Sequence, residues 1–530
     1  MILVPLFLLC ADSVVSFERH PNSISIQLDD GRAEIQLLSP GSLRVRRDWA
    51  RNAGAFAPRR PRYVPYKIEH TSAAIHIATT DLAVELQRSP LRISVSEPGG
   101  RMYLISAHAS RDGNNLKLDF ELNESDRLYG WGVNSQPRQD IRADAKPLVS
   151  RRAFLWSSGN YGLYFPRDAA YSLTTSPSGK TSVAVDGTAT MEFCLYSGGN
   201  AKDVFEKHRA CESEEFDLLR EHVGWLDPAT VPSYATPLPK AWPDALRGAI
   251  HVSLSAQPAP VFDLLALRNA SDSERKRAEL VAALMPLVSK PPGYQVPAAA
   301  ADLRQMFSLH LITYLQEIKD RGFPVIHPLP FQFPSDAAAA DAEDQFLLGD
   351  ELLIAPHIDG QHRKIYLPQG QWTDLETNRI HRGRQTIERL PVSDRPAMFA
   401  RNGAILPLET PGAVELHYFP KLGGEYFIYE LEQGEITQVH ASPAGDYLRL
   451  EIEERHGRQY EWVIHNIRRP VGIESQGVRF PHHPTSNLPV GAWRYDSVRS
   501  NLHVRVRLQA GDSIIVNCAF SEAVWYLLRP

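Results

Sequence analysis

The chain has 530 residues, of which 43% are hydrophobic and 22% are charged. This composition is typical of a soluble globular protein and excludes a long disordered chain, a collagen-like repeat and a membrane protein with many spans. The net charge of −5 leaves no basic surplus for a phosphate backbone, so nucleic acid is not expected as a partner. The length predicts several domains, because a single core rarely grows beyond about 300 residues.

The N-terminal residues Met1–Cys10 form an apolar run of the length found in signal peptides. No Lys or Arg precedes this run, so residues 1–14 predict either a weak export signal, to the periplasm or the cell exterior, or a buried first strand of a cytoplasmic protein. No later stretch reaches 18 apolar residues, so no integral membrane span is expected. The four cysteines lack a C-x-x-C pair, and we expect neither a disulfide framework nor a metal site.

Residues 15–200 alternate apolar and polar side chains in short runs between turns such as Ser39–Ser42. This pattern predicts an antiparallel β-sandwich with one buried face per sheet. A change follows at Ala201–Glu221, which has helical spacing, and helices then alternate with short strands predicted at Val223–Leu226 and Ala249–Leu254.

Asp302–Arg321 is the clearest predicted helix, because its apolar residues follow the i, i+3, i+4, i+7 pattern. Asp302 is expected to start it and Gly322 to end it, and His310 on the apolar stripe is expected to be a core histidine. From Val325 onward short strands return. They are predicted at Lys364–Leu367, Ala404–Leu406, Tyr426–Tyr429, Tyr447–Ile452, Tyr460–His465 and Ser513–Val516.

The turn in Thr410–Val414 is expected to separate two sets of these strands, and Ala337–Ala340 is expected to be a loop.

Several motifs rich in aromatic residues, glycine and proline occur in a fixed order along about three quarters of the chain. They are Arg127–Gly132, Trp156–Leu163, Gly322–Leu329, Gln345–Pro356, Ile365–Asp374, Arg401–Pro407 and Phe427–Glu430. Together they resemble glycoside hydrolase family 31, which contains α-glucosidases and α-xylosidases. The resemblance implies a mainly β protein with an α/β part: an N-terminal β-sandwich at 15–200, a truncated (β/α) barrel at 201–329, a proximal C-terminal β-sandwich at 330–410 and a distal C-terminal β-domain at 411–530.

The barrel is expected to be short. The family's (β/α)₈ barrel needs about 250 residues, whereas only about 120 lie between Cys211 and Leu329. At roughly 30 residues per βα unit, this length holds about four units.

The resemblance places the family's catalytic nucleophile at Asp227, two residues after Trp225. Thr230 stands where the family has a glutamate, and the alternative interpretation is that Asp227-Pro228 is a turn at a strand end. The acid/base aspartate should precede Trp242, but no carboxylate stands there. Asp244 follows Trp242 and is expected to lie at a helix start.

Asp263 matches a sugar-binding aspartate of the family, and the resemblance also implies that Trp225 contacts substrate. Around this site the sequence departs from the family, because Met285–Pro291 offers neither the expected arginine nor the expected histidine, and His327 replaces an arginine.

Three hypotheses remain open. The first is a family member that is catalytically impaired and at most binds α-linked glycans or glycosides. The second is an active retaining α-glycosidase with Asp227 as nucleophile and an acid/base from Asp244, Glu221 or a partner chain, since this chemistry requires two carboxyl groups. The third is a structural remnant that binds no sugar. The family's chemistry uses no cofactor, and the sequence indicates neither the sugar nor the oligomeric state.

Overall fold

The computed structural model describes residues 12–49, 63–132, 140–143, 146–151, 153–166, 169–211, 220–231, 236–238, 244–256, 259–357, 362–390, 393–430 and 434–522. The chain divides into two compact units, one comprising Met1–Glu214 and Leu254–Gln257 and the other Glu215–Ser253 and Pro258–Pro530. The predicted export signal at residues 1–14 lies largely outside the described residues.

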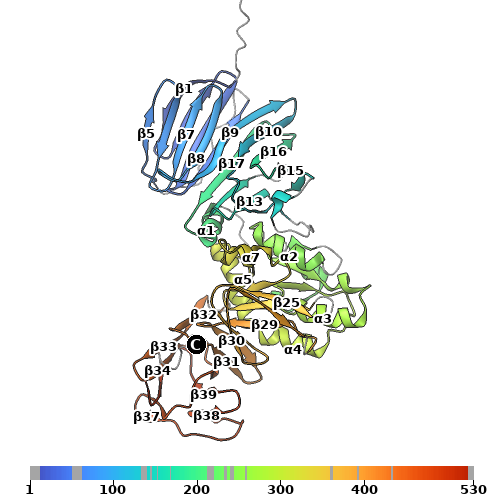
Figure 1. Cartoon of the computed structure of the whole chain (residues 1–530), viewed down its shortest axis with the longest axis vertical. Helices are drawn as coiled ribbons and strands as arrows, with labels where there is room; N and C mark the ends of the chain where they lie inside the picture. Colours follow the sequence, from blue (N-terminus) through green and yellow to red (C-terminus); the bar gives the residue numbers. More distant parts are fainter. Residues whose placement is uncertain are drawn as a thin grey trace, which may run out of the picture. The chain divides into compact units, whose positions relative to one another are not determined.

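The first unit is the predicted antiparallel sandwich (Figure 1). One sheet contains, in spatial order, β1 (Val14–Arg19), β2 (Ser23–Leu28), β3 (Gly31–Ser39), β4 (Ser42–Asp48), β17 (Thr190–Ser197), β14 (Tyr161–Phe165), β13 (Ala153–Ser157) and β11 (Leu128–Gly130). The other contains β12 (Leu148–Ser150), β15 (Tyr171–Thr175), β16 (Lys180–Asp186), β10 (Asn115–Glu121), β9 (Met102–Asp112), β8 (Leu91–Ser96), β7 (Ala83–Arg88), β6 (Ala74–Ala78) and β5 (Lys67–His70).

The apolar positions of the alternating runs form one continuous core between these sheets. Ile24, Ile26 and Leu28 of β2 and Ile75 and Ile77 of β6 belong to this core and are almost fully buried. The predicted turn at Ser39–Ser42 joins β3 to β4. Period-two alternation therefore predicted this sandwich correctly, because each of its sheets buries one face.

The second unit begins with a parallel α/β part, after helix α1 (Ala201–Cys211) of the first unit. Its sheet has the order β18 (Trp225–Leu226), β21 (Leu287–Ser289), β20 (Pro260–Asp263), β19 (Thr236–Pro237). The helices of this part are α2 (Asp244–Leu254), α3 (Asp272–Ala282), α4 (Ala298–Met306) and α5 (Ser308–Arg321). Strands β19, β20 and β21 pair in the order of the sequence, whereas β18, the first strand, pairs with β21, the last. Whether this sheet is a shortened (β/α)₈ barrel stays a prediction.

Two predictions in this part were wrong. Ala249–Leu254 is not a strand but the second half of α2, whose described side chains are buried on nearly every side. A helix buried all round has no amphipathic pattern, so its short apolar run could not be told from a buried strand. The helix predicted at Asp302–Arg321 starts at Ala298 and is broken at Phe307 into α4 and α5, although it ends at Gly322 as expected.

The proximal C-terminal part has two sheets that share one core. The larger has the order β22 (Ile326–Pro328), β23 (Phe346–Leu348), β24 (Leu352–Ala355), β29 (Ala397–Arg401), β26 (Gln371–Asp374), β27 (Ile380–Arg382), and the smaller pairs β25 (Arg363–Leu367) with β28 (Gln385–Arg389). Helices α6 (Leu329–Gln332) and α7 (Ala337–Asp341) precede β23. The predicted loop at Ala337–Ala340 is thus helical, because alanine has the strongest helix propensity and Asp336 caps the first turn by accepting from Ala339 N.

The distal C-terminal part also has two sheets around one core. One has the order β30 (Ile405–Thr410), β31 (Ala413–Tyr418), β35 (Gln459–Ile464), β39 (Asn501–Arg507), β38 (Ala492–Asp496). The other has the order β32 (Gly424–Glu430), β33 (Glu435–Ala444), β34 (Tyr447–Glu453), β40 (Ser513–Ala519), β36 (Gly472–Ser475), β37 (Val478–Arg479).

The turn within Thr410–Val414 does not separate two strand sets. It closes an antiparallel hairpin, because Thr410 pairs with Ala413 and the strands on both sides belong to one sheet. The change of sheet occurs earlier, between Arg401 and Ile405. In the described part of the chain, no helix is long and apolar enough to cross a membrane. Cys194 and Cys518 are buried free thiols, and Cys10 lies outside the described residues.

Helix α5 contacts the sheets of both C-terminal parts. His310 is fully buried, as predicted for a core histidine. Its Nε2 donates to Leu348 O of β23 at 3.0 Å, and its Nδ1 accepts from the hydroxyl of Tyr426 on β32 at 2.9 Å. One turn later, the Tyr314 hydroxyl donates to Glu351 at 2.7 Å.

The ring of Tyr314 leaves no space for a side chain at position 349, which is a glycine. Its φ is +64°, and a Cβ atom placed there would lie 2.1 Å from the ring. We expect Gly349→Ala to lower the free energy of unfolding by at least about 2 kcal/mol more than Gly445→Ala does. Gly445 is the matched control, because its φ is +67° and its Cβ would meet no atom within 4 Å. Urea unfolding measures both variants, and equal losses would contradict the steric role of Tyr314.

His310 should make the folded state sensitive to acid. Burial lowers its pKa to about 4 although Glu351 lies 3.9 Å away, so between pH 6.5 and 4 the unfolded chain binds a proton that the folded chain does not. From this group alone we expect the free energy of unfolding to be about 2 kcal/mol lower at pH 5 than at pH 7.5. Between pH 7.5 and pH 5, the free energy of unfolding of His310→Gln should fall by about 2 kcal/mol less than that of the unchanged protein, as measured by urea unfolding. An equal fall in both proteins would rule out His310 as the cause.

Candidate active site at the carboxyl edge of the parallel sheet

The two predicted site aspartates lie at the same edge of the parallel sheet. Asp263 is the last residue of β20 and pairs with Ser289 of β21, while Asp227 follows β18, whose last residue pairs with the same Ser289. They therefore flank the end of β21 on its two sides. Neighbouring strands are about 4.8 Å apart, so the backbones that carry Asp227 and Asp263 are separated by about 10 Å.

Asp227 is exposed and caps its own turn. Its Oδ1 accepts from Ala229 N at 3.0 Å, and its carbonyl accepts from the Thr230 amide at 2.8 Å and hydroxyl at 2.9 Å. Thr230, which stands where the family has a glutamate, thus closes this turn. Both interpretations of Asp227 have support in this geometry, because the residue ends a strand of the sheet and also forms a turn.

Asp263 is half-buried and has the same local arrangement. Its Oδ1 accepts from Leu265 N at 3.0 Å, and the chain then forms a short 3₁₀ helix at Leu264–Leu267. A side-chain oxygen that binds its own turn fixes the rotamer of the carboxylate. Both aspartates are therefore held at the edge, each with one oxygen engaged by the backbone.

Trp225 lies against a buried arginine rather than at the exposed edge. The guanidinium of Arg304 lies 5.5 Å from the centre of the Trp225 ring, and Arg304 is 2% exposed. It donates to the carbonyl oxygens of Val223, Gly224, Ala283, Met285 and Pro286. Arg304 thereby connects the segments that lead into β18 and β21, the two strands beside Asp227.

The other predicted residues are distributed differently. Asp244 starts α2, as expected, and accepts from Arg247 at 2.9 Å. The side chain of Glu221 and the whole of Trp242 lie outside the described residues. His327 is not at this edge, because it is fully buried on β22 between the rings of Tyr314 and Phe331.

The chemistry that this edge offers is hydrogen-bond acceptance by fixed carboxylates. The backbones that carry Asp227 and Asp263 are about 10 Å apart, because one strand lies between them. Fixed carboxylates at this spacing can accept hydrogen bonds from hydroxyl groups on two parts of one sugar. In the part of the chain that the structure describes, no group of three or more His, Cys, Asp or Glu residues could hold a metal ion.

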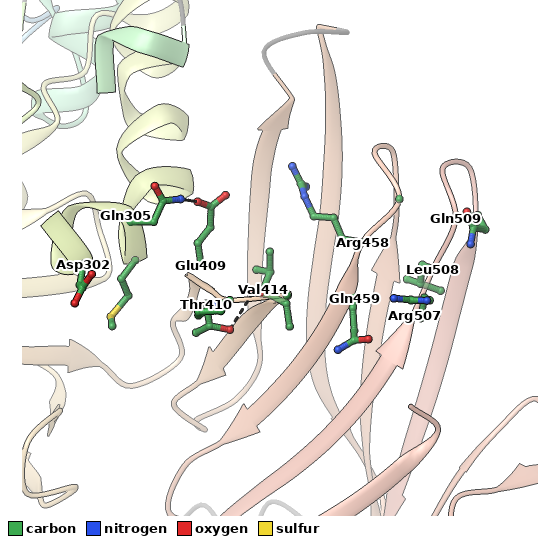
Figure 2. Close-up of a pocket in the computed structure, with 15 residues that line it drawn as sticks. Asp302, Gln305, Glu409, Thr410, Val414, Arg458, Gln459, Arg507, Leu508 and Gln509 are labelled. Carbon is green, nitrogen blue, oxygen red and sulfur yellow. Dashed lines mark hydrogen bonds between the residues drawn. The ribbon is translucent and has the colours of Figure 1, made fainter. Parts of the chain in front are cut away.

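Further hollows lie in the described part of the second unit, and none of them was predicted. One is an open groove of about 940 Å³ between α4 and the loops of the distal sheet, where Figure 2 shows Gln305 beside Glu409 and Arg507 on the far side. Its buried charge is already paired, because Arg458 binds Glu430 through both guanidinium nitrogens. The groove is therefore a polar surface without an unmatched inner charge.

Another hollow is a more enclosed cavity of about 450 Å³ that His417, His465 and His503 line together. These histidines are far apart in sequence and come from three segments of the distal sheet. The sequence contains one indication of these histidines: Glu415-x-His417 and His503-x-Arg505 place polar residues at alternate positions of two strands. Period-two alternation normally predicts a solvated face, and the cover over this face comes from distant residues.

Comparison with known proteins is consistent with this architecture. Residues 32–138 match the glycosyl hydrolase 31 N-terminal galactose mutarotase-like domain, and residues 322–406 match the glycosyl hydrolase family 31 C-terminal domain. Alpha-glucosidase 2 of Bacillus thermoamyloliquefaciens is 29% identical over 209 residues, which are 36% of this chain and 25% of that protein. Neutral alpha-glucosidase AB of Mus musculus is 41% identical over 100 residues, 18% of this chain and 10% of that protein. The matched segments thus span a quarter or less of these two relatives.

Solved structures show the same fold. The GH31 dextranase of Flavobacterium johnsoniae, in complex with glucose, superposes with a TM-score of 0.79 and 13% identity, over 96% of this chain and 100% of that one. The cycloalternan-forming enzyme of Listeria monocytogenes, in complex with a pentasaccharide substrate, gives 0.76 and 13%, over 96% of this chain and 77% of that one.

Arg304 should contribute strongly to the stability of the second unit. We expect Arg304→Met to lower the free energy of unfolding by about 3 kcal/mol or more, because it leaves several carbonyl oxygens without a donor. Arg268→Met is the matched control, since Arg268 is exposed in the same α/β part. Urea unfolding monitored by tryptophan fluorescence measures both, and a loss no larger than that of the control would contradict this role.

Proposed function

Because the chain belongs to glycosyl hydrolase family 31, we propose that it binds α-linked glycans at the carboxyl edge of its parallel sheet and hydrolyses them poorly or not at all. The observation that carries this proposal is the placement of Asp227 and Asp263. They end strands on either side of β21, and each holds its own turn with one oxygen.

The ligand class follows from the relatives and from the chemistry of the edge. The relatives are named as α-glucosidases, and two structural neighbours hold glucose or a pentasaccharide. Carboxylates accept hydrogen bonds from vicinal hydroxyl groups, and a charged acceptor strengthens such a bond. An α-linked glucoside that spans both strands would use Asp227 and Asp263 together.

The proposal of poor hydrolysis rests on the separation of the two strands that carry the aspartates. A nucleophile needs an acid that protonates the leaving oxygen from about 5 Å away. Asp263 lies on the other side of β21 from Asp227, and Asp244 is engaged by Arg247. Asp227 can bind a sugar, but the described strand next to it, β21 (Leu287–Ser289), carries no carboxyl group that could act as the acid.

Calorimetry with maltose and isomaltose tests the binding. We expect Asp227→Asn and Asp263→Asn each to weaken the affinity about tenfold, the loss of one charged hydrogen bond. Asp302→Asn, an exposed aspartate on α4, should leave the affinity unchanged. The same proteins are assayed on aryl α-glucosides, α-xylosides and α-galactosides.

Two results would overturn the proposal. Turnover that disappears in Asp227→Asn would establish an active retaining glycosidase with Asp227 as its nucleophile. Folded protein that neither binds nor cleaves any of these sugars would leave a structural role for the chain.

A further inference from the structure

The cavity lined by the three histidines lies on the outer face of the five-stranded distal sheet. The core face of that sheet is apolar, whereas the outer face carries polar side chains in cross-strand rows. One row contains His417, Val463, His503 and Arg494, and two residues further along Asn501 pairs with Asp496. His465 directly follows β35. This face is covered, and about 450 Å³ remains between it and its cover. Small-molecule sites have volumes of about 300–1,000 Å³.

The cover is largely apolar. Its apolar residues are Leu303, Met306 and Phe307 at the end of α4, with Leu375 and Met398 from the proximal part. Glu376, Ser393 and Arg395 of the proximal part line the cavity beside them. Leu303 and Phe307 are almost fully buried. A ligand in this cavity therefore meets an apolar wall on one side and polar groups on the other.

The histidines form a fixed hydrogen-bond chain. His465 Nδ1 lies 2.9 Å from Asn378 Oδ1, and its Nε2 lies 2.9 Å from His417 Nδ1. His417 Nε2 donates to Glu415 at 2.8 Å. The ring of Phe419 stacks on His465 with 4.4 Å between centroids. These two histidines thus use all four ring nitrogens within the protein.

The carboxylates of the cavity are also engaged. Glu415 accepts from His417, and Glu376 accepts from Arg389. Asp496 accepts from the amides of Val498 and Arg499 at 2.9 and 3.1 Å. Each acidic group that lines the cavity therefore already has a donor from this chain.

The arginines of the cavity are not matched in this way. Arg494 Nη2 lies 3.0 Å from His503 Nδ1, but that nitrogen also lies 2.8 Å from Glu461, which Arg505 binds as well. The Arg494 Nε is buried and has no partner within the described residues. Arg395 and Arg499 line the same cavity, and no carboxylate of the described chain lies within ion-pair distance of either. Because Glu376 is paired with Arg389, three arginines line this cavity against two other carboxylates, Glu415 and Asp496, and the net charge of the lining is positive.

We propose that this cavity binds a small organic carboxylate, with its carboxylate at Arg494 and an apolar body against Leu303 and Phe307. Guanidinium groups bind carboxylates through two parallel hydrogen bonds, and Arg494 is one of the residues that line this cavity. Arg395 and Arg499, which are exposed, add positive charge to the same cavity. The site is separate from Asp227 and Asp263, so it does not depend on glycan binding.

Calorimetry on the full chain tests this site with benzoate as the probe. Benzamide has the same shape without the charge, and acetate has the charge without the apolar body. We expect benzoate to bind at least tenfold more tightly than either. Arg494→Gln should weaken benzoate at least tenfold, whereas Arg507→Gln should leave it unchanged, because Arg507 lies on the groove of Figure 2 and does not line this cavity.

The Arg395→Gln, Arg499→Gln double variant covers the case in which Arg494→Gln fails to fold, since both residues are exposed, and it should also weaken benzoate at least tenfold. Absence of benzoate binding up to about 10 mM would overturn the proposal. Equal binding of benzamide, or unchanged affinity in the arginine variants, would overturn it as well. Maltose binding in the same proteins reports separately on the carboxyl edge.

Discussion

Helix α5 is the element on which the second unit depends, because its buried polar groups have partners on two different sheets. His310 can satisfy both ring nitrogens only while β23 supplies a carbonyl and β32 supplies a hydroxyl. A buried polar group without its partner costs about 1–3 kcal/mol, so displacement of either sheet is penalised. Leu309, the neighbouring residue, is part of the distal core. The helix therefore holds the proximal and distal parts in one fixed arrangement, and the cavity between α4 and the distal sheet depends on it.

The order of the parallel sheet determines what the candidate site can do. In a run of βα units, each new strand would add beside the previous one, and β19, β20 and β21 follow this rule. Strand β18 pairs with the last strand instead, so Asp227 and Asp263 lie on opposite sides of β21. The guanidinium of Arg304 donates to the segments that precede β18 and β21, and so it fixes the two strands whose pairing departs from this rule. The same order places the two aspartates at one edge with one strand between them.

The sequence was sufficient for the sandwich and for most C-terminal strands, because their alternation reflects a sheet with one buried face. It failed where burial was uniform, since the apolar residues of α2 surround the helix and resemble a strand over Ala249–Leu254. It also failed at the Pro411-Gly412 turn, which looks the same whether it closes a hairpin or joins two domains. Asp227 and Asp263 could be found by resemblance, but the strand between them could not, because pairing of β18 with β21 joins residues about 60 positions apart in the chain. The histidine cavity could not be predicted for the same reason, because the sheet face and the cover that enclose it come from segments far apart in the sequence.

The outer face of the distal sheet shows how a polar surface can be covered without losing its hydrogen bonds. An apolar cover such as Leu303 and Phe307 cannot supply donors or acceptors, so the polar groups of the sheet must satisfy one another across the strands. The cross-strand rows allow this, since Glu461 reaches both His503 and Arg505. Such a network is no more stabilising than apolar packing would be, because each charge loses its hydration on burial. A face built only for stability would therefore carry apolar residues here. Arg494, whose Nε has no acceptor among the described residues, lines the space that the cover does not fill, and a ligand that brings its own negative charge would complete the row.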